Sequence, residues 1–194
     1  MFLINRYIIF INKHVTNKFF MTLFVIFSLS SLIYPNSNEN SITDENTLIA
    51  AYIERFTRFI DWPQSHLIEN KSIIKIGISG NYNLYLKMVE FSSSIKIKNK
   101  VVEVKLIKTL DDINDIDIIF IGSKDLQKLS RILKICEENS ILTISYSQGF
   151  AEKGIIINLY KENNVFKFEI NEQKAREFGF KISHLLLSKS KIVR

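Results

Sequence analysis

The stretch that decides the fold is IDIIFIGSKDLQKLSRILKICEENSILTIS, residues 116–145, because it predicts a strand, a helix and a second strand in succession. Residues 116–121 and 141–145 are short apolar runs bounded by turn residues, which is typical of strands buried on both faces. Between them, residues 124–138 carry apolar side chains at helical spacing. A strand, a helix and a strand in this order indicate parallel strands joined by a crossover helix.

The same alternation continues toward the N-terminus. Residues 73–79 and 101–107 are β-branched, apolar runs that predict two more buried strands, and residues 82–91 predict a helix between them. We therefore expect an α/β domain with a mostly parallel sheet and helices on both faces. No internal repeat or low-complexity tract interrupts this pattern.

A strongly amphipathic helix precedes the strands. Residues 44–61 place apolar side chains at i, i+3 and i+4, with charged residues opposite. Ser41 and Thr43 are the expected N-terminal caps, and Pro63 lies just beyond the predicted end. Trp62 is expected to cover that end of the helix, with burial contributing roughly 2 to 3 kcal/mol.

The last third of the chain changes character. Residues 155–160 and 165–170 predict an antiparallel hairpin with one wet face, formed by Val165, Lys167 and Glu169. Asn171 stands where the N-cap of a following helix belongs, and Gly179 with Phe180 fits a Schellman stop. Ser183 is expected to cap a final short helix.

The N-terminus indicates export. Residues 1–36 contain basic residues, no acidic residue and an apolar run of about fifteen residues, which predicts either a secretory signal peptide or an uncleaved membrane anchor. Residues 37–43 form a polar linker, and residues 44–194 one domain. We expect this domain outside the cytoplasm, away from soluble nucleotide cofactors. Its only membrane contact would be a retained leader.

Net charge and cysteine content limit the classes of partner and of covalent link that we expect for this chain. Removing the leader takes away three of the 26 basic residues and none of the 20 acidic ones, so the net charge falls from +6 to +3 (23 minus 20). The remaining lysines are scattered, which argues against nucleic-acid binding. Cys136 is the single cysteine, so no intramolecular disulfide forms, and its helical spacing predicts a buried thiol.

The search for catalytic chemistry finds no motif. The six glycines form neither a dinucleotide fingerprint nor a phosphate-binding loop, and the three histidines are too far apart to predict a zinc site. Ser123 and Ser145 follow strands but lack a nucleophile-elbow context. We therefore expect no cofactor, no metal and no enzyme. The acidic residues at 111, 112, 115 and 117 are interpreted as a solvated connecting loop rather than a calcium site.

A set of short strings, in order over residues 44–193, resembles the YfiR-like family of periplasmic proteins. The strings are AAY (50–52), FIDWP (59–63), IIFIG (118–122), ILTIS (141–145), GFAEKG (149–154), IINL (156–159), FEIN (168–171) and ISHLL (182–186). The order, the spacing and the Trp-Pro pair after the first helix make this combination specific.

The resemblance implies a Rossmann-like, three-layer α/β/α sandwich without a dinucleotide site. It also implies a periplasmic, frequently dimeric regulator. The best-known member of the family acts as a repressor. It binds the periplasmic sensor part of an inner-membrane diguanylate cyclase and restrains cyclic di-GMP synthesis. That member has cysteine pairs, which this chain with its lone Cys136 cannot form, so redox control does not transfer.

Two sets of residues are predicted to bind ligands or partners. A crevice is expected where parallel strands end, at Ser79, Asn81, Gly122, Ser123, Ser145, Gln148 and Gly149. Aromatic side chains are expected to mark a docking face, with Tyr52, Phe59, Tyr82, Tyr85, Tyr146 and Phe150 as candidates. Asn158 and Asn171 are expected to satisfy backbone groups, or to contact a ligand.

Three functions follow from these expectations. The first is a regulator that docks on a membrane signalling protein and shifts its equilibrium by differential affinity for two states. The second is a periplasmic small-molecule binding module that serves a histidine kinase or another sensor. The third is a hydrolase, which requires a histidine or carboxylate within hydrogen-bond reach of Ser123 or Ser145.

Overall fold

The structure is a computed structural model that describes residues 44–66 and 68–194. The predicted leader, residues 1–36, and the predicted linker, residues 37–43, lie outside the described residues. Among the helices in the described part of the chain, none is long and apolar enough to cross a membrane.

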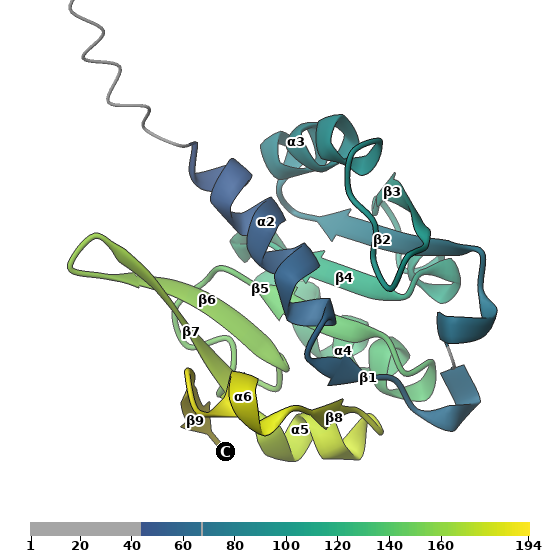
Figure 1. Cartoon of the computed structure of the whole chain (residues 1–194). Coiled ribbons are helices and arrows are strands. Elements are labelled where there is room, and N and C mark those ends of the chain that lie inside the picture. The colour runs from purple at the N-terminus through teal and green to yellow at the C-terminus, as the bar shows by residue number, and fades with distance from the viewer. Residues whose placement is uncertain (1–43, 67) are drawn as a thin grey trace, which may run out of the picture. The chain divides into compact units, whose positions relative to one another are not determined.

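The described domain is built on a seven-stranded sheet in the order β3-β2-β4-β5-β6-β7-β9, which Figure 1 shows with helices packed on it. Strands β2 to β5 pair in parallel, as do β5 with β6 and β7 with β9, whereas β6 and β7 pair antiparallel. The strands are β2 (Ile73–Ser79), β3 (Val101–Leu106), β4 (Ile118–Ile121), β5 (Leu142–Ser145), β6 (Ile157–Glu162), β7 (Val165–Asn171) and β9 (Lys191–Val193). The predicted α/β fold, mostly parallel with a C-terminal antiparallel hairpin, is confirmed.

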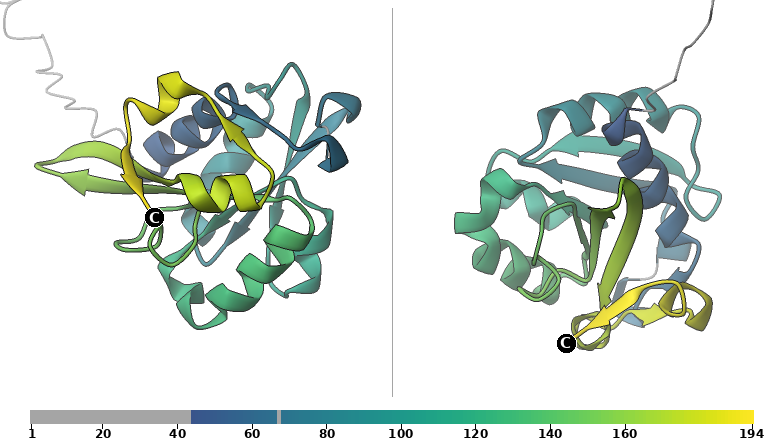
Figure 2. Two further views of the ribbon diagram at one scale, coloured as in Figure 1. Left: turned by 90° about the horizontal axis from the view of Figure 1, so that it is seen from below. Right: turned by 90° about the vertical axis from the view of Figure 1, so that its left-hand side faces the viewer.

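Helices cover both faces of this sheet. Helix α3 packs against α2 and β3, while α2 and α4 lie on opposite faces (Figures 1 and 2). Helices α3 and α4 lie on opposite faces because the crossover from β2 to β3 and the crossover from β4 to β5 run in opposite directions along the sheet, and right-handed crossovers of opposite direction use opposite faces. The α-helices are α2 (Glu45–Thr57), α3 (Tyr82–Ser92), α4 (Leu129–Glu138), α5 (Glu172–Glu177) and α6 (His184–Leu187). Short 3-10 helices are η1 (Gln64–His66), η2 (Ile68–Asn70), η3 (Asp111–Asp115) and η4 (Ser123–Lys128).

The core lies between these layers and is dominated by isoleucine. Strands β4 and β5 are buried on both faces, as their continuous apolar runs predict. Cys136 is fully buried on the inner side of α4, and burial raises the pKa of its thiol to about 12. The thiol is therefore protonated and serves as a small apolar group, as predicted.

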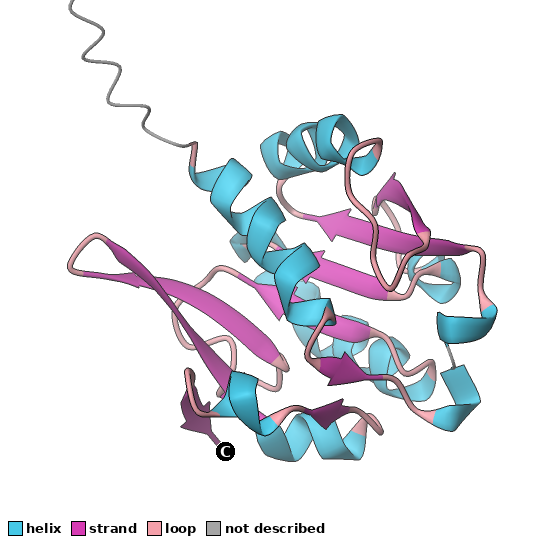
Figure 3. Ribbon diagram, viewed as in Figure 1, coloured by secondary structure: helices cyan, strands magenta, loops and turns pink. Residues whose placement is uncertain are grey.

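The first helix is shorter than its sequence pattern predicts. It starts after its N-cap Asp44, whose carboxylate accepts a hydrogen bond from the Asn46 amide at 3.3 Å, whereas the expected caps Ser41 and Thr43 lie outside the described residues. It ends at Thr57 because the next residues form strand β1 (Ile60–Asp61), which pairs with β8 (Lys181–Ile182) in a separate two-stranded sheet (Figure 3).

The predicted turn chemistry of the C-terminal third is confirmed. Asn171 caps α5 by accepting from the Lys174 amide at 2.9 Å. Gly179 has φ +85°, and the Phe180 amide donates to the Ala175 carbonyl at 2.8 Å, which is a Schellman stop. That stop places Phe180 edge-on against buried Trp62, at 5.6 Å between ring centroids. Ser183 caps α6 as expected.

The hairpin of β6 and β7 projects beyond the rest of the domain (Figure 1). Its two-residue turn has Asn163 and Asn164 at positive φ, +50° and +63°, which is the geometry of a type I′ turn. The prediction of a wet face holds for Val165 and Lys167, which are exposed, but it is wrong for Glu169, which is only 6% exposed. Glu169 contacts Asn158 of β6 and Lys191 of β9, so the local alternation of β7 does not predict its burial.

Candidate functional site

The predicted crevice residues do meet at one edge of the sheet. Ser79 pairs in register with Ile121, and Ile121 pairs with Ser145, so the three parallel strands end together. The Ser79 hydroxyl donates to Asp125 Oδ2 at 2.6 Å, and Asn81 caps α3 by accepting from the Leu84 amide at 2.9 Å. These side chains already have structural partners.

Between β2 and β4 this edge is closed. Gly80, with φ +71°, lies so close to Gly122 that a Cβ on Gly122 would lie 2.7 Å from the Gly80 carbonyl oxygen. The nearest hollow, beside Ser79 and Asp125, has a volume of only about 30 Å³, roughly the space of one water molecule. The crevice that we predicted where the parallel strands end therefore has no room for a ligand between β2 and β4. Ser123, just beyond, is exposed on the surface.

A larger hollow lies farther along the same edge, and we call it the hairpin groove. It exists because β5 ends at Ser145 whereas β6 continues to Glu162, so the outer part of the hairpin has no strand beside it. Its volume is about 630 Å³. It is lined by the loop after β5, by the hairpin and by the start of β9, that is, by Tyr146, Ser147, Gln148, Gly149, Glu152, Asn158, Leu159, Tyr160, Lys161, Glu162, Glu169 and Lys191.

The floor of the hairpin groove is a buried polar network. Asn158 Oδ1 accepts from the Ser145 hydroxyl and from the Ser147 amide, the latter at 3.2 Å. Asn158 Nδ2 donates to Glu169 Oε1 at 2.9 Å, because the two residues are cross-strand partners. Lys191 Nζ lies 3.5 Å from Glu169 Oε2. The network holds the Asn158 and Glu169 side chains in one orientation beneath the hollow.

An aromatic stack joins the groove to the first helix. Phe166 of β7 stacks with Tyr52 of α2 and with Tyr146, at 6.0 and 5.6 Å between ring centroids. The Tyr146 hydroxyl donates to Glu45 Oε1 at 2.8 Å, and Lys161 Nζ lies 3.1 Å from the same oxygen. Burial and the bond to Glu45 raise the pKa of Tyr146 to about 12, so its phenol stays protonated. The start of α2 is thereby tied to the groove wall.

The six aromatic residues predicted to form a docking face do not share one surface. Tyr52 and Tyr146 are half-buried in the stack, and Phe59 is half-buried at the end of α2. Phe150 is only 3% exposed, so its assignment to a partner surface is wrong: the turn after Gly149 folds its ring into the core.

The strongest exposed apolar feature lies on α3. Tyr82 is 59% exposed, and its neighbour Tyr85 is half-buried beside it. Leu86 and Val89 continue the same helix face at i+4 and i+7 and are 50% and 42% exposed. Sequence reasoning named the two tyrosines and missed the two aliphatic residues, although their helical spacing was visible.

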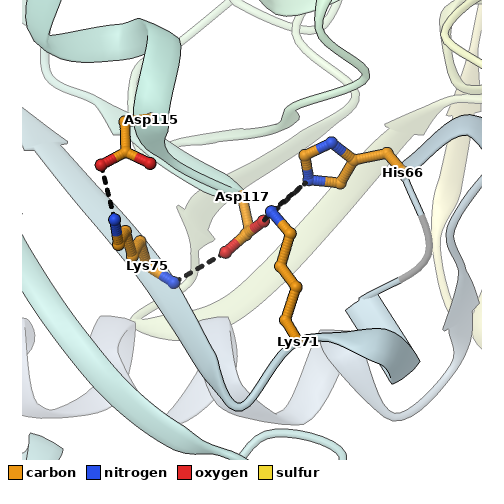
Figure 4. Close-up of polar contacts among 5 residues, drawn as sticks. All are labelled: His66, Lys71, Lys75, Asp115 and Asp117. Atoms are coloured by element: carbon orange, nitrogen blue, oxygen red, sulfur yellow. Dashed lines mark hydrogen bonds and ion pairs between the residues drawn. The ribbon is translucent and has the colours of Figure 1, made fainter.

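A second ionic cluster lies at the opposite edge, where the parallel strands begin (Figure 4). Asp117 is 1% exposed, so its assignment to a solvated loop is wrong. Its Oδ1 accepts from His66 Nε2 at 2.7 Å and from Lys71 Nζ, and its Oδ2 accepts from the Lys75 amide at 2.8 Å. Burial alone would raise the pKa of Asp117, but these donors outweigh burial and lower it overall.

Ser123 and Ser145, the two serines considered as nucleophiles, differ in exposure, and Ser123 lies on the surface. Ser145 is fully buried, and its hydroxyl donates to the amide oxygen of Asn158, which is not a base.

Within residues 44–66 and 68–194, no group of three or more histidine, cysteine or acidic side chains is placed to hold a metal ion.

The binding residues predicted from the sequence include none of the groove's charged side chains. Tyr146, Gln148, Gly149 and Asn158 were named as possible contacts, whereas Glu169 was assigned only to a wet strand face and Lys191 was given no role. Glu169 enters the site only through its cross-strand pairing with Asn158, and Lys191 only through the pairing of β9 with β7. The hairpin was predicted from its local pattern, so the pairing of Glu169 with Asn158 could have been inferred from it, whereas the pairing of β9 with β7 leaves no local signal in the sequence.

Comparisons with known proteins bear on the whole domain. The profile of the YfiR/HmsC-like family matches residues 46–191. A conserved domain protein from Vibrio cholerae is similar in structure, with a TM-score of 0.53, 10% identity and coverage of 75% of this chain and 60% of that one. The ABC domain in complex with L-Trp from Streptococcus pneumonia has a TM-score of 0.48 and 12% identity over 62% of this chain and 55% of that one. The match thus spans little more than half the length of these two structures. Comparison with curated proteins gives no match.

Proposed function

This chain belongs to the YfiR/HmsC-like family, and on that premise we propose that it is an exported regulatory protein that docks on the extracytoplasmic sensor domain of an inner-membrane signalling protein. The partner class suggested by the family is a diguanylate cyclase, whose cyclic di-GMP output the docked protein would restrain. The regulator acts by binding the inactive state of its partner more tightly than the active state.

The observation that carries this proposal is the extent of the family match. It covers residues 46–191, which is nearly the whole described domain, rather than a short motif. The basic, apolar leader predicted over residues 1–36 agrees with a periplasmic location. The absence of a nucleotide-binding loop from the sequence agrees with regulation by contact.

The docking face that we assign is the exposed side of α3. Tyr82, Leu86 and Val89 form a continuous apolar stripe there, and Tyr85 extends it. Exposed aromatic and aliphatic side chains of this kind are the usual anchors of protein interfaces. The other half-buried aromatics, Tyr52, Phe59 and Tyr146, pack inside the domain and contribute less to such a surface.

The test combines deletion of the gene with capture of the partner. Deletion is expected to raise cellular cyclic di-GMP, and tagged protein is expected to capture a membrane protein with a periplasmic sensor domain. A variant with Tyr82→Ser, Leu86→Ser and Val89→Ser should lose the captured partner. The matched control is Leu185→Ser, since Leu185 is an exposed leucine on a different helix, α6. Unchanged cyclic di-GMP together with no captured sensor protein would reject the proposal.

The hairpin groove favours a second candidate function, a periplasmic small-molecule binding module that serves a histidine kinase or another sensor. A hollow of about 630 Å³ with a buried polar floor falls in the size range of small-molecule sites. The bond from Tyr146 to Glu45 offers a route from the groove to the start of α2. Native mass spectrometry of the protein purified from its own cells tests this candidate, and a bound metabolite is the expected result.

A further inference from the structure

The floor of the hairpin groove contains a carboxylate oxygen that lacks a hydrogen-bond donor. Glu169 is 6% exposed, and Asn158 Nδ2 donates to its Oε1. The other carboxylate oxygen of Glu169, Oε2, forms an ion pair with Lys191 among the described residues, and its distance to Lys191 Nζ is 3.5 Å. Charge-assisted hydrogen bonds are shorter, about 2.7 to 2.9 Å, and a buried charged group without its full set of partners is costly. Glu169 therefore has capacity for one further cationic donor.

A second polar atom in the same wall has no partner. The Ser147 hydroxyl is buried and makes no hydrogen bond to any part of the chain that the structure describes. Its backbone amide is already bonded to Asn158, so the loop that carries it is held in place. Buried hydroxyl groups in native proteins nearly always have a partner. Ser147 and Glu169 are both among the residues that line the hairpin groove.

The charges that line the groove are unequally satisfied. Lys161 pairs with Glu45, outside the lining, and Glu162 pairs with Lys167. Glu152 is exposed and has no hydrogen bond or ion pair to other described residues. The unsatisfied charge of the lining is therefore negative.

The ammonium group of Lys191 occupies the position beside Glu169 that the ammonium group of a bound ligand would take. It lies on β9, a three-residue edge strand, its side chain is 60% exposed, and its ammonium contacts Glu169 only at the long distance given above. An ammonium group on a free molecule would replace it at closer range. The rings of Tyr146 and Tyr160 line the same hollow and would attract the methylene groups beside such a cation.

From these observations we infer that the hairpin groove binds a small organic amine, whose ammonium displaces Lys191 and bonds to Glu169. A diamine or longer polyamine fits best, because Glu152 at the rim offers a second carboxylate. An anion is disfavoured, since Glu169 on the floor would repel it. This inference rests on the second candidate function and names the ligand class of that site.

The experiment is calorimetric titration of full-length protein in non-ionic detergent at low salt. The probes are 1,4-diaminobutane and spermidine, with 1,4-butanediol as the neutral control and succinate as the anionic control. The two amines are expected to bind, and the two controls are not. Glu169→Gln should weaken amine binding at least about tenfold, because it removes the charge but keeps an oxygen for Asn158. Glu103→Gln, on exposed β3, should leave binding unchanged.

A further variant separates this inference from a merely structural role of Glu169. Lys191→Ala removes the competing ammonium and should tighten amine binding several-fold, whereas Lys134→Ala, on an exposed lysine of α4, should not. If succinate binds and Lys191→Ala weakens it, the groove is a ligand site and the amine class is wrong. If no probe binds wild-type or Lys191→Ala protein, the amine inference is overturned. A metabolite retained in native mass spectra would then still support the second candidate function.

Discussion

Asp117 and Glu169, the two acidic residues whose side chains the structure describes as buried, lie at opposite edges of one sheet, and their partners differ. Asp117, where the parallel strands begin, has three donors, from His66, Lys71 and the Lys75 amide. Glu169, within β7 and level with the end of β5, has one hydrogen bond and one long ion pair. A buried charge with a full set of donors is costly to disrupt, whereas an incompletely satisfied one beside a hollow is available to a ligand. The comparison separates a structural cluster from a candidate site.

The largest expected effect is on stability at the Asp117 edge. Asp117→Ala removes the acceptor shared by three donors and leaves the Lys75 amide without its partner. We expect a loss of about 3 kcal/mol in the free energy of unfolding, because breaking a buried pair is costly even when the cations are partly exposed. Urea denaturation followed by circular dichroism measures it. The control is Asp111→Ala in the same acidic run, at an exposed residue, which should change stability by less than about 0.5 kcal/mol. Equal losses would show that Asp117 is not special.

A pH titration sharpens the same contrast. The folded pKa of Asp117 lies below its ordinary value of 3.8, because the three donors outweigh burial. The stabilisation is therefore fully present above that value and is lost as the pH falls through it toward the folded pKa. We expect the urea midpoint of wild-type protein to drop below about pH 4 more steeply than that of Asp117→Asn. Parallel curves for the two proteins would contradict this assignment.

The comparison of Asp117 with Glu169 also shows which features of the domain can be predicted from the sequence and which cannot. The strands over 73–79 and 141–145 were predictable because burial on both faces leaves continuous apolar runs. Asn171 and Gly179 were predictable because a cap or a positive φ constrains the residue type locally. Asp117 was not, since its partner His66 lies 51 positions away and the surrounding aspartates suggested a wet loop.

The hairpin groove was half predictable for a related reason. Parallel strands end together, so the loop after Ser145 was correctly placed at an edge of the sheet. Which part of that edge is open depends on packing: Gly80 and Gly122 close one part, and the longer hairpin leaves the other free. Such close approaches depend on three-dimensional spacing, which a pattern of residue types does not contain.

The smallest expected effect is the stability change at Glu169. Glu169→Gln keeps an oxygen for Asn158 Nδ2 and removes only a charge whose pairing with Lys191 is long and partly exposed. We expect the free energy of unfolding to change by less than about 1 kcal/mol, because a polar isostere needs no ion pair and the freed Lys191 returns to water. Urea denaturation at pH 7 measures the change beside that of Asp117→Ala. A loss as large as the one at Asp117 would place both carboxylates in the same structural role, and the distinction between a fold-stabilising cluster and an incomplete ligand site would fall with it.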